Sequence, residues 1–305
     1  MTSTLDAVST DPTPTHGFDT GRRSGRIRKH RRRTMIRLTV LSVILFPLCI
    51  VWIYPFIWMV SASLKSNKEI FAGLNPFPEI IRLDNYIRAW EQANIGQYFF
   101  NTVFITFFSI IISVTSTALI GYVLGRHRFP GKKVVLGLFA AAIFLPEGFT
   151  IIPIFDLISN LHLSGSLWGV TLAEAGGAHV VSTLLFAGYF RQLPNELEES
   201  ARMDGAGFFR IFALIYLPLA KPVVATAIIL QFMHSWNSFL LPLVLTLSRP
   251  ELRTLAVGVY SFRGEYLNDW SGMAAASTIT LLPIIIVFLF LQRYFVESIA
   301  GAVKS

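Results

Sequence analysis

Polar side chains in one apolar stretch of this sequence have the types and the spacing to bind a polar ligand. Gln231, His234 and Ser238 lie at positions i, i+3 and i+7, so a single helix would place them on one face. Trp236 and Asn237 flank that face. A polar strip beside an aromatic ring suits a sugar, which has hydroxyl groups on its edges and apolar C–H groups on its faces. Hydrogen bonds between neighbouring helices would explain the same pattern equally well.

The sequence lacks the patterns typical of nucleotide hydrolysis and of metal binding. Gly125–Lys133 reads G-R-H-R-F-P-G-K-K and comes close to a phosphate-binding loop. It has five residues between the glycines instead of four, and no Ser or Thr follows the lysine to hold Mg²⁺. His16, His30, His127 and His162 have no ligand partners at a useful spacing. We therefore expect no enzymatic activity, no metal site and no cofactor in this chain.

A short acidic segment that begins N-E-L-E-E-S-A-R-M-D-G could form a separate surface element. Asn195 can cap a helix and Glu198 can close a capping box, which predicts a helix over Glu196–Met203. Gly205 would end it, because glycine tolerates the backbone angles of a tight turn. A second amphipathic stretch, Phe208–Tyr216, follows. The pattern predicts a helix-turn-helix at the membrane surface, as an interfacial element or as a docking site for a soluble partner.

The elements that carry these residues are predicted to cross a membrane. Hydrophobic residues make up 53% of the 305 residues, charged residues only 14%, and the mean hydropathy is +0.57. Soluble domains carry roughly 25% charged residues, so the apolar excess must face lipid. A spanning helix needs about 20 apolar residues. We predict an all-α membrane protein with six transmembrane helices, at Leu38–Leu64, Tyr98–Leu124, Val134–Phe155, Leu167–Phe190, Val223–Leu247 and Trp270–Gln292. The third span is expected to be interrupted by Pro146, Glu147 and Gly148.

The distribution of basic residues predicts the orientation. Nine Lys and Arg residues against three Asp residues precede the first span, within residues 1–37. Six spans put both termini on one side, and if that side is cytoplasmic the inner segments hold 19 Lys and Arg and the outer segments seven. The positive-inside rule favours this arrangement. We therefore expect a disordered basic cytoplasmic tail over 1–34, a six-span domain over 35–305, and a cytoplasmic loop over 191–222.

Two more polar residues, Glu174 and His179, lie inside the predicted fourth span. Polar groups within a bilayer are costly and are often functional. These two are five positions apart, so they do not share a helical face, and either could bond a neighbouring helix.

The 191–222 loop resembles the EAA loop of ABC importer permeases. Their pattern is E-A-A-x-x-x-G, nine residues, then I-x-L-P, and the residues at its seven defined positions are Glu199, Ser200, Ala201, Gly205, Ile215, Leu217 and Pro218. Ser200 alone departs, since it replaces the middle alanine. Three further stretches are similar to the carbohydrate-uptake branch, and in particular to its maltose-permease G-type subunits. They are S-L-K-S-N-K-E-I-F, S-W-N-S-F-L-L-P-L and Q-R-Y-F-V-E-S-I-A-G-A-V-K-S.

The resemblance, which runs from about Arg37 to the C-terminus, implies a function and a set of partners. It implies a type I ABC importer permease (MetI-like) fold and half of a heterodimeric pore in the bacterial plasma membrane. The cargo would be a mono-, di- or oligosaccharide or a related polyol, delivered by a sugar-binding lipoprotein or periplasmic protein. A second, maltose-permease F-like subunit and two ATPase subunits, which carry ATP and Mg²⁺, would complete the complex. The residues it assigns to ATPase coupling are Glu198, Glu199, Ala201, Asp204, Gly205 and Ala206.

An outer segment, 248–270, holds Tyr260, Phe262, Arg263 and Tyr266. An aromatic belt at the membrane interface is the ordinary explanation, whereas the resemblance implies contact with the binding protein.

Other functional classes fit less well. A secondary transporter or channel without an ATPase predicts internal repeats and paired charges at mid-membrane, and the sequence shows no clear repeat. The basic N-terminal run abuts an apolar segment without aromatic interleaving, which favours membrane lipid over nucleic acid as its partner. The sequence names no particular sugar.

Overall fold

The computed structural model describes residues 20–303 apart from 74, 93, 178, 261 and 263–268. Every regular element among these residues is helical, which confirms the all-α prediction for the described part of the chain. The chain divides into two units, Met1–Ile57 and Trp58–Ser305, and the second unit holds all of the predicted site residues.

The first helix, α1 (Thr20–Ser63), contains a 27-residue apolar stretch, Arg37–Ser63, that is long enough to cross a membrane. This stretch agrees with the predicted first span. The helix extends back into the 1–34 segment, for which the sequence predicts a disordered tail, while residues 1–19 lie outside the described part.

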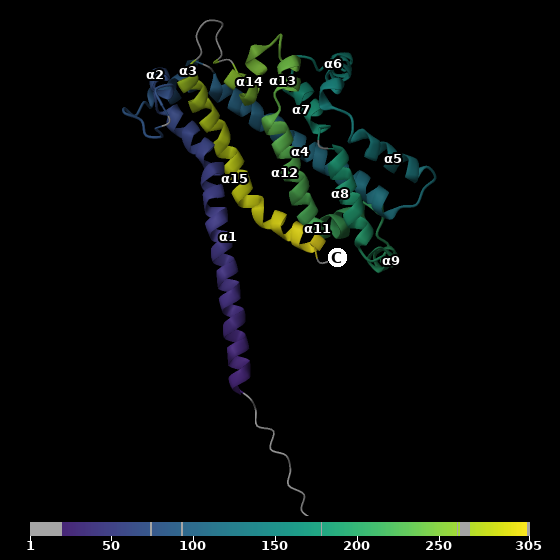
Figure 1. The fold of residues 1–305 in the computed structure, drawn as a ribbon. Coiled ribbons are helices and arrows are strands. Elements are labelled where there is room, and N and C mark those ends of the chain that lie inside the picture. Colours follow the sequence, from purple (N-terminus) through teal and green to yellow (C-terminus); the bar gives the residue numbers. More distant parts are fainter. Residues whose placement is uncertain are drawn as a thin grey trace, which may run out of the picture. The chain divides into compact units, whose positions relative to one another are not determined.

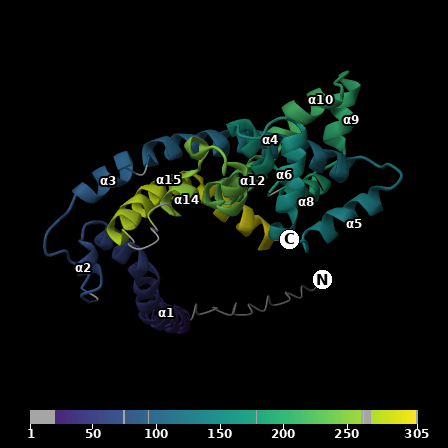
Figure 2. The same cartoon turned by 90° about the horizontal axis from the view of Figure 1, so that it is seen from above.

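A bundle around α4 (Ile95–Arg126) forms the core of the second unit. α4 packs against α7 (Leu167–Ala175), α8 (His179–Gln192) and α12 (Lys221–Asn237), and α12 packs in turn against α15 (Trp270–Val303) (Figures 1 and 2). α4 and the first part of α15 are each apolar enough and long enough to cross a membrane, as predicted for the second and sixth spans.

Two glycines bring α4 and α8 into close contact. Gly121 and Gly125 are four positions apart on α4, which is the small-xxx-small spacing of closely packed membrane helices. A β-carbon at 121 would overlap the Phe186 side chain, and one at 125 would lie 2.9 Å from the Ala187 carbonyl oxygen. The backbones can therefore approach this closely only where the side chain is a single hydrogen.

The third predicted span, Val134–Phe155, is interrupted where the sequence predicts a break, around Pro146. α5 (Lys132–Ala142) ends early, and a 3₁₀ turn, η1 (Glu147–Thr150), leads into α6 (Ile151–Asn160). Pro146 lies at the break with extended backbone angles, φ −66° and ψ 133°. Proline cannot donate the backbone hydrogen bond that would continue α5, and it disfavours helical angles in the residue before it.

The predicted fourth span is broken, because α7 and α8 form a pair bent by 47°. The segment Phe208–Leu219 meets α12 at 83°, just before the predicted fifth span begins at Val223. Among the described residues three helices are apolar and long enough to span a membrane, or five if each bent pair counts as one span.

The predicted fifth span also fails as a single helix at its far end, since α12 stops at Asn237 and α13 (Leu240–Leu245) follows. Pro242 explains the break, because in a continuous helix its ring would clash with the Ser238 carbonyl four residues earlier.

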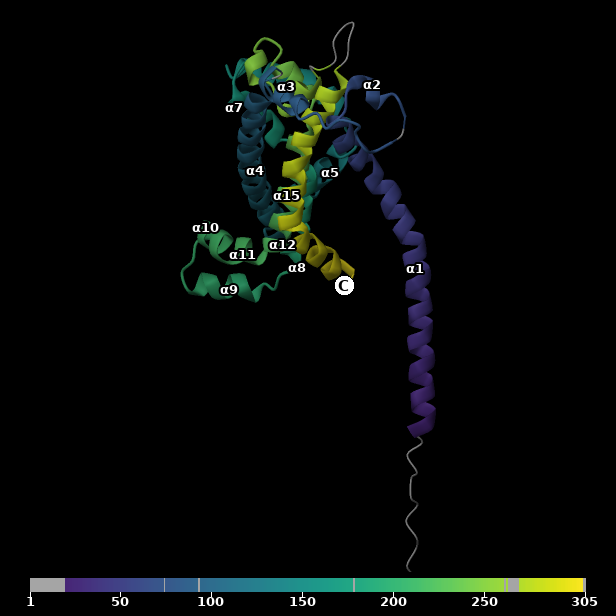
Figure 3. The same cartoon turned by 90° about the vertical axis from the view of Figure 1, so that its left-hand side faces the viewer.

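The remaining short helices lie at the two ends of the bundle (Figures 1 and 3). At the end where α4 begins lie α2, α3, η3 and α14, with the bounds Asn67–Ile70, Asp84–Gln92, Pro250–Leu252 and Leu255–Tyr260. At the end where α4 stops lie α9, α10, the π-helical turn η2 and α11, with the bounds Glu196–Met203, Phe208–Ile211, Phe212–Tyr216 and Leu217–Leu219.

Candidate functional site

The acidic segment folds as the predicted short helix followed by a tight turn. α9 spans Glu196–Met203, as expected from the sequence. Gly205 has φ +77°, its N–H donates to the Arg202 carbonyl at 3.0 Å, and the Ala206 N–H donates to the Ala201 carbonyl at 2.9 Å. These two bonds form a Schellman motif, in which a left-handed residue just beyond the helix satisfies its last carbonyls. The turn reverses the chain and leads it into α10.

The predicted capping box is wrong. Asn195 has helical backbone angles, φ −71° and ψ −29°, and its side chain makes no capping hydrogen bond. Its backbone carbonyl instead accepts from the Glu198 N–H at 2.9 Å. The Glu198 carboxylate is therefore available for partners elsewhere in the fold.

Glu198 lies at the centre of a polar network that fixes α9 to the bundle. Its carboxylate accepts from Arg202 at 2.7 Å, from the Tyr216 hydroxyl at 3.2 Å and from the Arg126 Nε at 3.4 Å. Burial raises the pKa of this carboxyl, but the hydrogen bond and charge of Arg202 and the Tyr216 hydroxyl outweigh it, so the pKa lies below its ordinary value. Glu198 is therefore ionised at neutral pH, and its carboxylate is directed toward Arg126 and Tyr216 of its own chain.

Arg126, the last residue of α4, connects this network to the start of the loop. Its side chain is only 6% exposed, and it donates to the Leu193 carbonyl at 2.8 Å and to the Pro194 carbonyl at 3.4 Å. Its guanidinium also lies over the Tyr216 ring, 5.2 Å from the centroid. One side chain thus holds the chain before α9, α9 itself through Glu198, and the π-helical turn after it.

An aromatic cluster supports the same loop from the side of the bundle. The fully buried Tyr122 of α4 packs against Tyr216, Phe212 and Phe208 at ring separations of 4.8, 5.4 and 5.1 Å. Ala201 is 7% exposed and packs in this cluster. The Ala201 methyl group therefore packs within its own chain, and its part in ATPase coupling remains a prediction about how the loop is supported.

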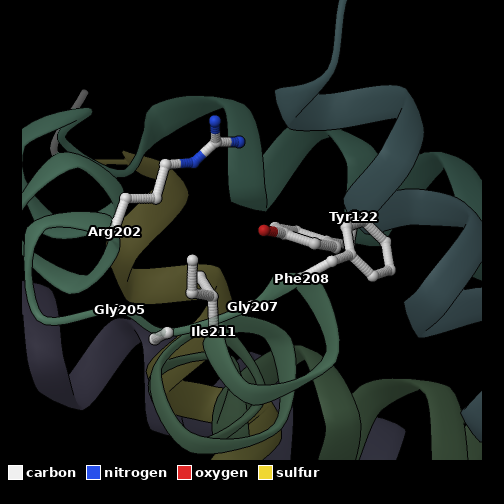
Figure 4. Close-up of a pocket in the computed structure, with 7 residues that line it drawn as sticks. Tyr122, Arg202, Gly205, Gly207, Phe208 and Ile211 are labelled. Carbon is white, nitrogen blue, oxygen red and sulfur yellow. The ribbon is translucent and has the colours of Figure 1, made fainter.

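The outer face of α9 is open and partly apolar. Met203 is 88% exposed and Leu197 is 38% exposed, and Glu199, Ser200 and Asp204 are exposed between and beside them. A shallow cavity of about 370 Å³ adjoins the end of this helix (Figure 4). Its lining residues are Tyr122, Arg202, Gly205, Ala206, Gly207, Phe208 and Ile211. The Tyr122 hydroxyl points into it and has no hydrogen-bond partner among the described residues.

Two members of the predicted polar strip of α12 are packed inside the chain. Gln231 is fully buried and donates to the Glu174 carbonyl at 2.9 Å. Trp236 is 3% exposed, stacks on Phe232 and donates its indole N–H to the Thr280 carbonyl at 3.2 Å. Neither side chain is open to a passing ligand in this structure. Of the two alternatives, hydrogen bonds between neighbouring helices therefore describe these two residues better than a ligand-binding strip does.

The predicted i, i+3, i+7 face ends before its last member. Ser238 follows the end of α12 with extended backbone angles, φ −63° and ψ 129°, so it does not continue the face of Gln231 and His234. His234 has a side chain that is 23% exposed, and its Nε2 lies 3.4 Å from a carboxylate oxygen of Glu174. Asn237 is exposed. Ser238 is partly exposed beyond the end of the helix, so His234 and Asn237 are the open polar residues of the strip that α12 itself carries.

The predicted outer contact residues lie near α14. Tyr260 is 50% exposed and contacts the Phe239 ring at 5.4 Å, while Phe262 is partly buried against the apolar cluster that contains Trp236. Arg263 and Tyr266 lie outside the described residues.

Sequence reasoning missed Arg126, Tyr122 and Tyr216, whose partners lie far away along the chain. For Arg126 the only signal was a basic residue at the end of an apolar span, which the orientation rule already explained. For Glu174 a signal existed, since a carboxylate inside a predicted span needs a partner, but the sequence does not reveal that His234 is that partner.

Comparisons with known proteins agree with this architecture. A family model described as "Binding-protein-dependent transport system inner membrane component" matches residues 117–301. The chain is 35% identical to the probable ABC transporter permease protein YurM of Bacillus subtilis, over 91% of this chain and 92% of that protein. It is 32% identical to the diacetylchitobiose uptake system permease protein NgcG of Streptomyces coelicolor, over 85% and 86%.

The maltodextrin transport system permease protein MdxG of Bacillus subtilis is 33% identical, with 89% of this chain and 95% of that protein covered. A similar solved structure is that of a bacterial ABC transporter involved in the import of the acidic polysaccharide alginate. Its matching chain gives a TM-score of 0.74 at 26% identity, over 87% of this chain and 98% of that chain.

Proposed function

The chain belongs to the family of binding-protein-dependent transport system inner membrane components, and from this premise we propose how it works as half of a sugar-importing pore. Membership makes it a multi-pass membrane protein and the permease component of an ABC importer. The observation that carries the mechanism is the loop around α9. It is held to α4 by Arg126 and Glu198, while the opposite face of α9 carries the exposed Leu197 and Met203.

The α9 loop is the docking surface for a separate ATPase subunit. Its exposed apolar groups lie beside the shallow cavity at the end of α9, so a side chain of a partner could enter that cavity while Leu197 and Met203 pack against the partner's surface. ATP and Mg²⁺ belong to the ATPase subunits. Movement of the ATPase would pass through Glu198 and Arg126 to α4, because these groups bind α9 to the end of that helix.

The proposed topology has six crossings with both termini in the cytoplasm. In support, the α9 loop and the far end of α15 lie at one end of the bundle, and α3 and α14 lie at the other (Figure 1). α5 and α6 together would supply the remaining crossing, broken at Pro146.

The proposed cargo is a sugar or related polyol. The proposal draws on relatives named for diacetylchitobiose, for arabinooligosaccharides, for melibiose, raffinose and stachyose, and for maltodextrin. A second permease subunit, of maltose-permease F-like type, would complete the pore. A sugar-binding lipoprotein or periplasmic protein would dock at the end where α14 and Tyr260 lie.

The experiment is reconstitution of the chain with a second permease, the ATPase subunits and a binding protein in liposomes. The sugar panel is diacetylchitobiose, arabinotriose, raffinose and maltotriose, and uptake is compared with and without ATP. We expect uptake of at least one sugar, only with ATP and only with the ATPase subunits present. Uptake that persists without the ATPase would favour a secondary transporter or channel, and uptake of none of the four would refute the proposed cargo.

A further inference from the structure

A buried carboxylate, that of Glu174, lies at the break between α7 and α8, away from the α9 loop. Glu174 is fully buried in the last turn of α7, and it is the only Asp, Glu, Lys or Arg in the sequence of the predicted fourth span, Leu167–Phe190. Ionisable residues inside the membrane face the bundle interior or a water-filled cavity, and they mark transport pathways. The partner that reaches Glu174 here is His234 of α12, with 3.4 Å between a carboxylate oxygen and the ring Nε2.

The break between α7 and α8 is shaped to receive this imidazole. Gly177 follows α7 closely, and a β-carbon at that position would overlap the His234 ring. Gly176, its neighbour, has no such restriction, since the nearest atom to a β-carbon there is the Ala173 carbonyl oxygen at 3.5 Å. Gln231, one turn before His234, binds the Glu174 backbone carbonyl at 2.9 Å. Two side chains of α12 are thus bonded to the same residue of α7.

The polar side chains of α12 form a line from the interior to an open face. Gln231 is fully buried, the side chain of His234 is 23% exposed, and Asn237 is exposed. These residues are three apart, so they follow one another along the helix. Asn237 donates to the Met233 carbonyl of its own helix at 2.8 Å, yet an exposed amide remains costly in lipid, so polar side chains of membrane helices rarely face it. The open end therefore faces water, cargo or the other half of the pore.

We infer that Glu174 is a positioning residue that holds the His234 imidazole at the edge of the translocation pathway. There the exposed edge of the ring, together with the Asn237 amide, binds the hydroxyl groups of a passing sugar. The inference rests on the proposed function, because it takes the cargo to be rich in hydroxyl groups. It adds a binding site within this subunit and assigns Glu174, which touches no cargo, the role of orienting it.

The test uses the complete reconstituted transporter and measures sugars imported per ATP hydrolysed, with the panel sugar that the wild type takes up fastest. The variants are Glu174→Ala, Glu174→Gln, His234→Ala and Gly177→Ala, with Gly176→Ala as the matched control. We expect Glu174→Ala, His234→Ala and Gly177→Ala to lower this ratio about tenfold, the effect expected when a buried polar group loses its hydrogen-bond partner, with basal ATP hydrolysis retained. Glu174→Gln, which keeps an acceptor and the side-chain volume, should recover most of it.

The Gly176→Ala control should behave as the wild type, because its added methyl group reaches no other helix. An unchanged ratio in Gly177→Ala and His234→Ala would overturn the inference. Parallel loss of assembly, uptake and basal ATP hydrolysis in all variants would also overturn it, since that pattern belongs to a helix-packing seam.

A second measurement separates this inference from the proposed cargo. In a Cys49→Ser background, a cysteine at position 234 should react with a small water-soluble thiosulfonate faster than one at the buried Ser235. Ser235 is 2% exposed and lies within hydrogen-bond reach of α4. Faster labelling supports the pathway position even if no panel sugar is taken up, and equal or slower labelling at 234 contradicts it.

Discussion

The turn after α9 provides a sharp test, because its glycine is required by backbone conformation alone. Gly205 has φ +77°, and a β-carbon built there would meet no heavy atom within 4 Å. The cost of a side chain at 205 is therefore conformational and not steric. For alanine this cost is about 1 kcal/mol, the lower end of the penalty for left-handed backbone. For valine it is about 2 kcal/mol, because a β-branched side chain is a genuine outlier at positive φ.

These costs predict a graded loss of the native turn. One to two kcal/mol corresponds to a factor of about 5 to 30 in a conformational equilibrium. Gly205→Ala should therefore weaken retention of the ATPase subunits and uptake moderately, and Gly205→Val should weaken both severely. The assay is co-purification of the ATPase subunits with the permease, followed by sugar uptake in the same preparation.

Gly207 offers a matched control two residues away. Its φ is −78°, and a β-carbon there also meets no heavy atom within 4 Å. Gly207→Ala should therefore assemble and transport as the wild type does. Full assembly and normal uptake in Gly205→Val, or equal damage in Gly207→Ala, would refute the reasoning.

Three further predictions concern the supports and the open face of the loop. Because the pKa of Glu198 is lowered in the fold, its carboxylate should stabilise the loop at pH values above the ordinary carboxyl pKa of 4.5, and this stabilisation should be lost as the pH falls below 4.5. Hydrogen exchange of the α9 amides, measured against pH, should show the loss. Glu198→Gln should abolish the pH dependence, whereas Glu199→Gln, at an exposed position, should keep it. Gly121→Ala should destabilise the purified subunit by about 1–3 kcal/mol through overpacking against α8, whereas Gly188→Ala, with no atom within 4 Å of its β-carbon, should leave the unfolding midpoint unchanged. Met203→Ser should leave the unfolding midpoint unchanged, because the side chain is 88% exposed. The same variant should weaken ATPase binding about tenfold or more in a titration, because it removes an apolar group that the partner would bury. Unchanged affinity would exclude Met203 from the interface.

Local sequence signals predicted most of the long helices but not every break within them. α1, α4 and α15 follow from runs of apolar residues, and the turn at Gly205 follows from the backbone angles that glycine permits. Pro146 predicted the break in the third span, which the structure shows. Pro242 was an equal signal in the fifth span, but the apolar composition outweighed it in the prediction, because hydropathy measures partition into lipid and not helix continuity.

The candidate site was only partly predictable for a different reason. Glu198 fits a capping box by spacing, yet its carboxylate bonds to Arg126, which lies 72 positions earlier. A charged hydrogen bond to a buried arginine outweighs a local cap, and no local pattern reveals which of the two will form. The pairing of Glu174 with His234 across two helices is hidden from the sequence in the same way.

The central claim, that the open face of α9 binds the ATPase, is tested most directly by site-specific photocrosslinking. A photoreactive amino acid replaces the exposed Met203 in the assembled transporter, and a second preparation carries it at Tyr260 at the opposite end of the bundle. The account predicts that position 203 captures the ATPase subunit and that position 260 never does. Capture of lipid or of the binding protein at 203, with no ATPase adduct, would contradict it.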